Sequence, residues 1–506
     1  MTFLWPNRPL KDLVTALATR GPLRRVGRRT FTRSYLDTFD GRLYAAGWTL
    51  TLVEEPAGRF LEGRDLLGAL RCRVAAGEVP SFAEELPAGG LAEALGPEIT
   101  PRRLLTQATV EVRATRFEAL DDREKTVARF HVERRRARFP GNRQAHGLPA
   151  RVVVEALRGF EDAAIERAAA CGELGLEPMT ADELTEVLAR VDRRPGEDPA
   201  RLALRLDAAG SAGDAVVHIH TALLAVLRAT EDGVRQEFDP EFLHDYRVAL
   251  RRTRSLLGQL PGVFDEEATE RFRRDLGRLA RETGPARDLD VFLAELTQEV
   301  ADEPALRRDL APVIALVGRH RRRAGRRLRQ VLEGPRTARV LSDWQAFLAT
   351  PTFGPAAAQP VRALFGEALE RARARLLRRG SRLDAGSAPE DYHRLRIDAK
   401  KLRYVLETGA SLWDKEDVAK RLAPLKALQE LLGGAQDLAV REARLIDAAA
   451  ELATTAGPAA LVAIGRLVER AHRRRFELYQ EFPDAFAGFA SPAEQKRWSR
   501  LLRPSR

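Results

Sequence analysis

Two eleven-residue segments decide the fold of the C-terminal part of this chain: HDYRVALRRTR at residues 244–254 and HRLRIDAKKLR at residues 393–403. Both begin with histidine and carry basic residues three, seven, eight and ten positions later. The segments GPARDLD (284–290) and GGAQDLA (433–439) follow them at the same offset of 149 residues. An offset that stays constant over about 40 residues indicates an internal duplication. We therefore predict two copies of a unit of several helices.

Helical geometry places most of these basic residues on one narrow face. Positions 0, +3, +7 and +10 of an α-helix fall within an arc of about 80°. We call the two resulting sets the cationic ridges: His244, Arg247, Arg251 and Arg254 in the first copy, and His393, Arg396, Lys400 and Arg403 in the second. Like charges at these spacings repel and destabilise an isolated helix. An unmixed cationic face that occurs twice therefore indicates a binding surface.

Further basic residues near the ridges are candidates for the same surface. They are Arg278, Arg281, His320, Arg323, Arg327, Lys426, His472 and Arg475. The basic runs at 319–329 and 473–475 are equally consistent with ordinary solvated surface. Asp288 and Asp437, which follow glycine in both copies, are predicted to cap helices, with pairing to arginine as the alternative.

The ligand suited to such ridges is an elongated polyanion. Arginine forks grip phosphate oxygens, and a nearby histidine can donate a hydrogen bond and gain charge as the pH falls. The tyrosines of these segments fall on or near the apolar side, which argues against a platform for stacked bases. No carboxylate or second histidine stands at ligand spacing beside His244 or His393, so neither a metal nor a cofactor is expected.

The charge distribution points to the same half of the chain. The 506 residues carry a formal net charge of +11, of which +1 lies in residues 1–200 and +10 in residues 201–506. The C-terminal part therefore calls for an anionic partner. Two cysteines without a CxxC motif, the lack of a signal peptide, and apolar runs such as 311–318 that are too short for a bilayer predict a cytoplasmic protein without a membrane partner.

A boundary is expected near residue 200, where the segments 191–201 and 207–216 are rich in Pro, Gly, Asp and Ser. Before it, strand-like segments at 29–38, 48–55, 109–120 and 126–136 predict an α+β domain with a mostly antiparallel sheet. After it, amphipathic helices predict an all-α part, with helix stops that include Gly284-Pro285 and Gly433-Gly434. We predict domains at 1–200 and 205–506, the second made of antiparallel four-helix repeats at about 210–350 and 360–505.

The duplicated segments resemble a known family. FDPEFLHDYRVALRRTRS (238–255), GPARDLDVFL (284–293) and YHRLRIDAKKLRYVLE (392–407) are similar to the CHAD domain, over roughly residues 210–505. The resemblance implies two four-helix units with pseudo-twofold symmetry around a basic pore or groove that binds inorganic polyphosphate. It implies that role for the two cationic ridges and for six residues on neighbouring helices: Arg278, Arg281, His320, Arg323, His472 and Arg475.

The N-terminal part resembles the CYTH, or triphosphate-tunnel, fold through SYLDTFDGRLYAAGWTLTL (34–52). Active members open with an E-x-E-x-K strand that serves a divalent metal and phosphate, and residues 1–35 hold no such motif. Thr51 stands where an arginine is expected, and the surroundings of Glu155 lack paired acids. We therefore expect a degenerate domain that acts as a scaffold or a remodelled pocket.

Three functions remain at this stage. The first is a non-enzymatic polyphosphate-binding protein of the cytoplasm, associated with polyphosphate granules. The second is a CYTH-type metal-dependent triphosphatase or adenylate cyclase. The third is a module that binds nucleic acid without sequence specificity.

Overall fold

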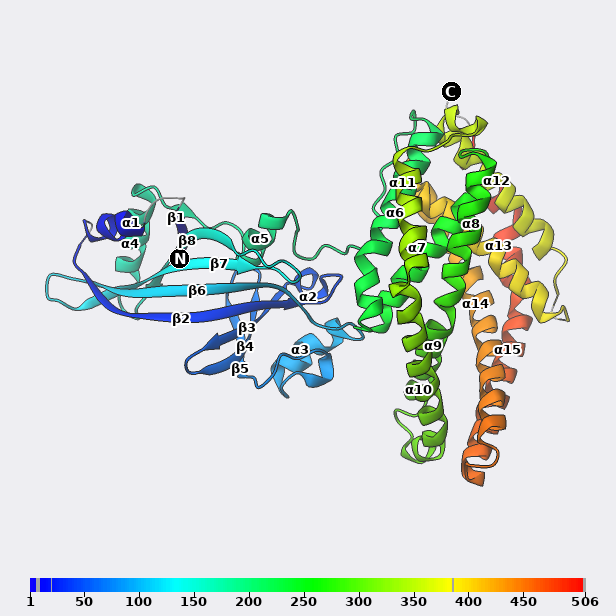
Figure 1. Ribbon diagram of the computed structural model, residues 1–506, viewed down its shortest axis with the longest axis horizontal. Helices are drawn as coiled ribbons and strands as arrows, with labels where there is room; N and C mark the ends of the chain where they lie inside the picture. Colours follow the sequence, from blue (N-terminus) through cyan, green and yellow to red (C-terminus); the bar gives the residue numbers. More distant parts are fainter. Residues whose placement is uncertain (6–9, 20, 385, 504–506) are drawn as a thin grey trace. The chain divides into compact units, whose positions relative to one another are not determined.

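The computed structural model describes residues 1–5, 10–19, 21–384 and 386–503. The chain forms two compact units, Met1–Pro199 and Ala200–Arg506. The first is built around an antiparallel sheet and the second consists of helices (Figure 1). The predicted combination of an α+β part with an all-α part is confirmed.

The first unit contains one nine-stranded sheet. Its order is β5-β4-β3-β2-β6-β7-β8-β1-β9, and the described neighbours pair antiparallel. The strands are β1 (Thr2–Trp5), β2 (Leu23–Asp37), β3 (Trp48–Glu55), β4 (Gly58–Asp65), β5 (Leu70–Ala75), β6 (Leu105–Leu120), β7 (Thr126–Arg138), β8 (His146–Ala156) and β9 (Glu177–Pro178). The four strand-like segments of the sequence correspond to β2, β3, β6 and β7.

Short helices cover the sheet of the first unit. They are α1 (Leu10–Ala18), α2 (Arg42–Ala45), α3 (Gly90–Ile99), α4 (Glu161–Glu173) and α5 (Glu183–Leu188), with the 3₁₀ turns η1 (Ala83–Glu85) and η2 (Ala189–Val191). One apolar core joins α1 and α4 to β1, β7 and β8, and a second joins α3 to β3 and β4. A third core holds α5 against β2 and β6, which brings Glu183 to the middle of the sheet.

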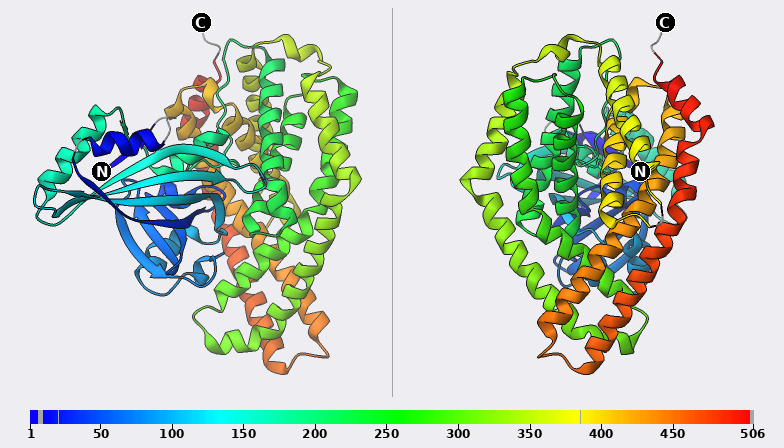
Figure 2. Two further views of the ribbon diagram at one scale, coloured as in Figure 1. Left: turned by 60° about the vertical axis from the view of Figure 1, so that its left-hand side comes forward. Right: turned by 90° about the vertical axis from the view of Figure 1, so that its right-hand side faces the viewer.

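The second unit is built from long helices. They are α6 (Ala212–Arg235), α7 (Pro240–Gln259), α8 (Glu266–Glu282), α9 (Gly284–Glu299), α10 (Pro304–Glu333), α11 (Pro335–Ala349), α12 (Val361–Gly380), α13 (Pro389–Thr408), α14 (Lys415–Leu452), α15 (Pro458–Ala490) and α16 (Pro492–Leu501), with η3 (Pro355–Ala358) and η4 (Ala410–Leu412). Figure 2 shows the first half, in green, and the second half, in yellow to red, lying side by side.

The helix boundaries reproduce the duplication. The starts of α6 and α12, of α7 and α13, and of α8 and α14 are each 149 residues apart. Asp265 and Asp414 stand at equivalent positions, and both carboxylates cap their helices by accepting backbone N–H groups. Equivalent helices also contact one another, α6 with α12, α7 with α13 and α10 with α15. Contacts between a helix and its own duplicate are the mark of a pseudo-twofold arrangement.

The two repeats differ where helix stops were predicted. In the first repeat α8 ends before Gly284 and α9 begins there, but in the second α14 runs unbroken through Gly433 and Gly434. Pro285 explains the break, because its ring lacks a backbone donor and clashes with the preceding turn, whereas its counterpart Gly434 keeps its N–H. The predicted stop at Gly433-Gly434 and the predicted capping roles of Asp288 and Asp437 are therefore wrong, since both aspartates lie inside helices.

Among the residues that the structure describes, one helix, α6, is long and apolar enough by length and composition to cross a membrane. It packs against α7, α10, α11 and α12, and more than half of its most apolar stretch is buried inside the unit. Buried core helices have the same composition. The reading of apolar runs from the sequence overlooked this helix because polar residues such as His218 and His220 interrupt it.

Candidate anion-binding site

The cationic ridges lie on α7 and α13, which contact each other. Asp239 opens α7 by accepting the backbone N–H groups of Glu241 and Phe242. The opposite side of each helix is buried, with Tyr246 and Leu250 in α7 and Leu402 in α13 fully covered. The register predicted from the apolar positions is therefore observed, and each ridge is left on the half-buried to exposed side of its helix.

The two ridges approach each other at Arg251 and Lys400, which occupy equivalent positions. The Arg251 guanidinium lies 5.6 Å from the centre of the Tyr404 ring on α13. Burial, together with repulsion from Arg396 and Arg251, lowers the pKa of Lys400 to about 8, and the more distant carboxylate of Asp437 opposes the shift. In the part of the chain that the structure describes, neither Arg251 nor Lys400 has a carboxylate within 4.0 Å. Positive charge from both repeats is thus concentrated there without a direct counter-ion.

Each ridge histidine is held by a residue at an equivalent position. Arg287 Nη2 donates to His244 Nδ1 at 3.1 Å, and His393 Nδ1 lies 2.7 Å from Gln436 Oε1. Because a guanidinium only donates, the neutral His244 ring carries its proton on Nε2. In the second repeat, the Gln436 carbonyl oxygen accepts from His393 Nδ1–H, so the Nε2 of His393 becomes a donor only when the ring is protonated. The histidines are therefore equivalent in place and different in chemistry.

Arg247 and Arg396 also differ because of the break after α8. Arg247 Nη1 donates to Ala280 O at 3.3 Å and to Thr283 Oγ1 at 2.9 Å, at the end of α8. Burial and repulsion from Arg251 and Arg287 lower the pKa of Arg247, although Asp288 opposes the shift. In the second repeat the counterpart of Ala280 is Gln429, which lies inside the unbroken α14, and the counterpart of Thr283 is Leu432, which has no hydroxyl group. Arg396 instead pairs with Asp437 at 3.4 Å.

A basic pocket adjoins the first ridge. It has a volume of about 440 Å³ and is lined by Arg254, Glu270, Arg273, Arg274, Gly277, Arg278 and Arg281. These side chains carry five positive charges and one negative charge. Burial and repulsion from Arg281 and Arg273 lower the pKa of Arg254, which lies over Gly277. Because Arg254 belongs to the ridge, the pocket continues the ridge onto α8.

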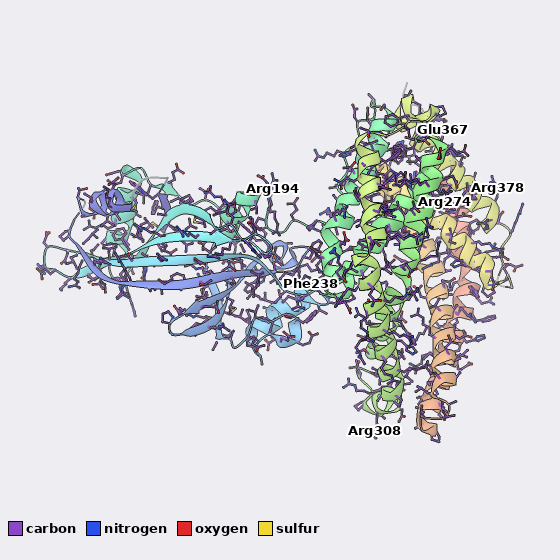
Figure 3. The ribbon with its side chains drawn as sticks, in the orientation of Figure 1. Arg194, Phe238, Arg274, Arg308, Glu367 and Arg378 are labelled. Carbon is purple, nitrogen blue, oxygen red and sulfur yellow. The ribbon has the colours of Figure 1, made fainter. Side chains whose placement is uncertain are left out.

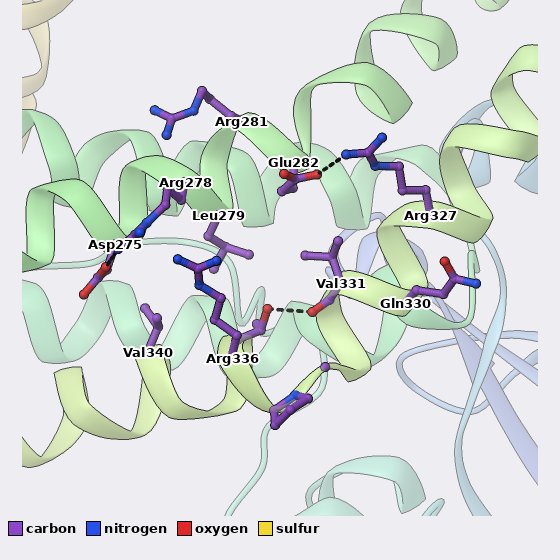
Figure 4. A pocket seen from close by; sticks show the side chains of 13 residues that line it. Asp275, Arg278, Leu279, Arg281, Glu282, Arg327, Gln330, Val331, Arg336 and Val340 are labelled. Atoms are coloured by element: carbon purple, nitrogen blue, oxygen red, sulfur yellow. Dashed lines mark hydrogen bonds and ion pairs between the residues drawn. The ribbon is translucent and has the colours of Figure 1, made fainter.

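A second pocket shares Arg278 and Arg281 with the first. Its volume is about 460 Å³, and α8, the end of α10 and the start of α11 form its walls. Arg336 extends from α11 toward Arg278 and Leu279, while Arg281 projects from α8 on the side away from Arg336 (Figure 4). Arg327 pairs with Glu282 at 3.4 Å, and Arg278 pairs with Asp275. Four arginines and two carboxylates leave this pocket positive as well.

The structure does not bring every predicted residue to the ridges. His320 lies 3.2 Å from Glu451, and the Glu442 carboxylate lies 3.1 Å from Arg475 and 3.5 Å from His472. Within the second ridge itself, Arg403 pairs with Glu407 on the same helix at 2.8 Å. Arg323 and Lys426 are exposed on α10 and α14 and have no ion pair among the described residues. Sequence spacing within one helix could not reveal these acids, because most of them come from neighbouring helices.

Several residues of this region were not predicted from the sequence. Arg287 and Gln436 hold the histidines, and their common offset of 149 residues was a usable signal. Arg273 and Arg274 line the first pocket and were visible only as part of a basic run. Arg336 lies at the start of α11, and nothing in its sequence surroundings marks it.

The first unit contains a pocket of a different kind. It measures about 550 Å³, and its lining includes four arginines (Arg29, Arg33, Arg64 and Arg151) and six carboxylates (Glu62, Asp65, Glu133, Glu155, Asp182 and Glu183). Sequence motifs missed this cluster because the acids come from separate strands and from α5.

These charges neutralise one another inside the first unit. Glu183 accepts Arg151 at 2.9 Å, Arg135 at 2.9 Å and Arg33 at 3.2 Å, and Glu133 accepts Arg151 at 2.6 Å. Burial opposes the ionisation of Glu183, but the three arginines hold its pKa well below the usual range. Within the described ranges, no group of three or more His, Cys, Asp or Glu side chains is arranged to hold a metal ion.

Comparisons with known proteins concern the helical unit. The crystal structure of the CHAD domain from the plant Ricinus communis aligns at 27% identity with a TM-score of 0.49, covering 57% of this chain and 95% of that one. PptA from Streptomyces chartreusis aligns at 17% identity with a TM-score of 0.43, covering 57% of this chain and 100% of that one. No curated protein matches the sequence. The family model of the CHAD domain matches residues 218–446, a stretch that includes both cationic ridges, and the C-terminal unit of this chain therefore contains a CHAD domain.

Proposed function

We propose that the C-terminal unit binds inorganic polyphosphate along α7 and α13, without catalysing a reaction. The observation that carries the proposal is the meeting of Arg251 and Lys400, which come from equivalent positions of two repeats and have no direct counter-ion among the described residues. A positive charge that lowers the pKa of a neighbouring lysine by repulsion also attracts anions, and a bound anion relieves that repulsion. The CHAD resemblance supports polyphosphate as that anion.

The chemistry of the ridge suits a linear chain of phosphates. Arginine forks contact non-bridging oxygens in pairs, which matches the repeated phosphate groups of a linear polymer. Tyr246, Tyr392 and Tyr404 are at most 6% exposed, so the ridge segments offer no open aromatic ring to a base. This favours polyphosphate over single-stranded nucleic acid, which is held by stacking as well as charge.

The test is charge reversal at the meeting point in the full-length protein. Arg251→Glu with Lys400→Glu should lower polyphosphate affinity by about 100-fold, the equivalent of losing two charge-assisted contacts. The matched control is Arg308→Glu with Lys496→Glu, which makes the same change of charge at exposed positions. Arg308 lies near the start of α10 (Figure 3). Equal affinity in the two variants, with both folded by circular dichroism, would contradict the assignment.

The N-terminal unit is proposed to act as a scaffold without catalytic turnover. The charges of its pocket support this, because six carboxylates outnumber four arginines there and leave no surplus positive charge for a triphosphate. Magnesium- or manganese-dependent hydrolysis of ATP or tripolyphosphate by the purified chain would overturn it. Within a cell, the whole protein is expected to gather at polyphosphate granules in the cytoplasm, which a fluorescent fusion would test.

A further inference from the structure

The basic pocket between α8, α10 and α11 has a counterpart in the second repeat. Five residues of α8 line this pocket, the second of the two described above, and the five residues that follow them by 149 positions line a pocket of about 470 Å³ between α14 and α15. Three of these pairs are Arg278 with Ala427, Leu279 with Leu428, and Arg281 with Glu430. The duplication has therefore kept the position and size of the pocket while its chemistry has changed.

The second repeat lacks the basic residues that line the pockets of the first repeat. Arg273 and Arg274 of the first repeat correspond to Leu422 and Ala423 of the second. The pocket of the second repeat is lined mainly by apolar side chains, and its charged groups are Glu430 and Glu481. A carboxylate at the place of Arg281 repels a phosphate instead of binding it. An anion that reaches this point can continue along the first repeat and is rejected by the second.

A row of cations leads from the meeting point of the two ridges into the pockets of the first repeat. Lys400 and Arg251 repel each other where the ridges meet, and Arg254 follows Arg251 by three residues on α7. Arg254 in turn is repelled by Arg281 and Arg273 across the first pocket. Arg278 and Arg281 belong to both pockets, and Arg336 reaches into the second from α11 (Figure 4). Pockets of about 300–1,000 Å³ are the usual size for small-ligand sites.

We propose that these two pockets are a one-sided extension of the polyanion site, which takes the part of a linear polyphosphate that continues beyond the ridges. The inference rests on the proposed function. It makes the protein sensitive to polymer length, since an oligophosphate that fits on the ridges does not reach Arg278 and Arg336. It also means that the bound polymer extends beyond the ridges only on the side of the first repeat, although the unit is pseudo-symmetric.

The test converts the first repeat into the second at two positions. Arg278→Ala with Arg281→Glu copies Ala427 and Glu430, and the full-length variant is titrated with long-chain polyphosphate and with tripolyphosphate. Arg278 and Arg281 are exposed, so the fold should be kept. The matched control is Lys496→Ala with Arg308→Glu, which removes the same charge at remote exposed positions. We expect a loss of about tenfold or more for the long chain and of less than about twofold for tripolyphosphate.

The salt dependence gives a second readout. For the long chain, each lost phosphate contact should make the negative slope of log affinity against log salt shallower by about one. The slope for tripolyphosphate should stay unchanged. Unchanged long-chain affinity would overturn the extension, and so would an equal loss for both lengths, which would mean a general field effect. Failure of the Arg251→Glu and Lys400→Glu variant to weaken binding would instead overturn the proposed function, whatever the pocket variant does.

Discussion

Arginines line a pocket in each unit of this chain, and the two units use them in opposite ways. In the first unit Arg33 and Arg151 are paired with Glu133 and Glu183, and the pocket holds more carboxylates than arginines. In the second unit Arg251, Arg254 and Arg281 have no ion pair among the described residues. The difference separates two roles of the same side chain. Paired arginines hold a fold together, whereas unpaired arginines leave charge available for an external anion.

The largest expected effect comes from breaking the pairing in the first unit. Glu183→Gln removes the buried carboxylate with which Arg33, Arg135 and Arg151 all pair. It should therefore lower the free energy of unfolding by about 3–5 kcal/mol. The control is Glu118→Gln, whose partner Arg24 is 57% exposed, with an expected change of about 0–1 kcal/mol. Urea unfolding measures the free energy of unfolding of both variants. A Glu183→Gln variant as stable as the Glu118→Gln control would contradict the structural role of the network.

The same network predicts the direction of an acid effect. The folded pKa of Glu183 lies below its unfolded value, so its contribution is fully present above the unfolded pKa of about 4.3. That contribution is lost as the pH falls below this value toward the folded pKa. Glu183→Gln should therefore reduce the acid sensitivity of the first unit.

A smaller effect should separate the two repeats at Arg247 and Arg396. Arg247→Ala removes hydrogen bonds to the end of α8 and should lower the free energy of unfolding by about 1.5–3 kcal/mol. Arg396→Ala removes a long pair to Asp437, which is 64% exposed, and should change it by about 0–1 kcal/mol. Equal effects in thermal or urea unfolding would mean that the break after α8 does not need Arg247.

The smallest effect is a pH dependence of binding through Lys400. Its pKa of about 8 is lowered mainly by burial and then by Arg396 and Arg251, and a bound polyanion should raise it. The bound state then holds more protons, so affinity should fall as the pH rises above 8, by up to about tenfold per unit. Lys400→Arg, which keeps its charge, should abolish the fall. A wild-type affinity that is flat between pH 7.5 and 9.5 would contradict the assignment.

The sequence was sufficient for features that repeat along the chain. The duplication was visible because α7 and α13 keep the same length and the same cationic positions, and the strands β2, β3, β6 and β7 were visible through their composition. The first repeat has Pro285 where the second has Gly434, and α8 and α9 are separate helices whereas α14 is continuous. The prediction missed this difference because a glycine precedes both positions, at 284 and at 433, and was read as a helix stop in both repeats. Local periodicity therefore gave the framework of the helical unit.

The sequence was not sufficient for charges that meet through tertiary packing. Glu442 and Glu451 lie on α14 and neutralise candidate residues of α15 and α10, which the spacing within a single helix does not reveal. In the first unit, Glu133 and Glu183 are 50 residues apart and meet on the same arginines. Which cations remain unpaired is a property of the folded chain, and the binding site is defined by that property.

The most direct measurement is a titration of the full-length protein with long-chain polyphosphate at two salt concentrations, beside matched RNA and DNA. It should include the variant with Arg251→Glu and Lys400→Glu and the control with Arg308→Glu and Lys496→Glu. We predict tight binding of polyphosphate that survives higher salt better than binding of either nucleic acid and is lost only in the Arg251 and Lys400 variant. If all three polyanions bound alike and weakened together with salt, and both variants were affected equally, the ridges would be ordinary basic surface and the proposed function would be wrong.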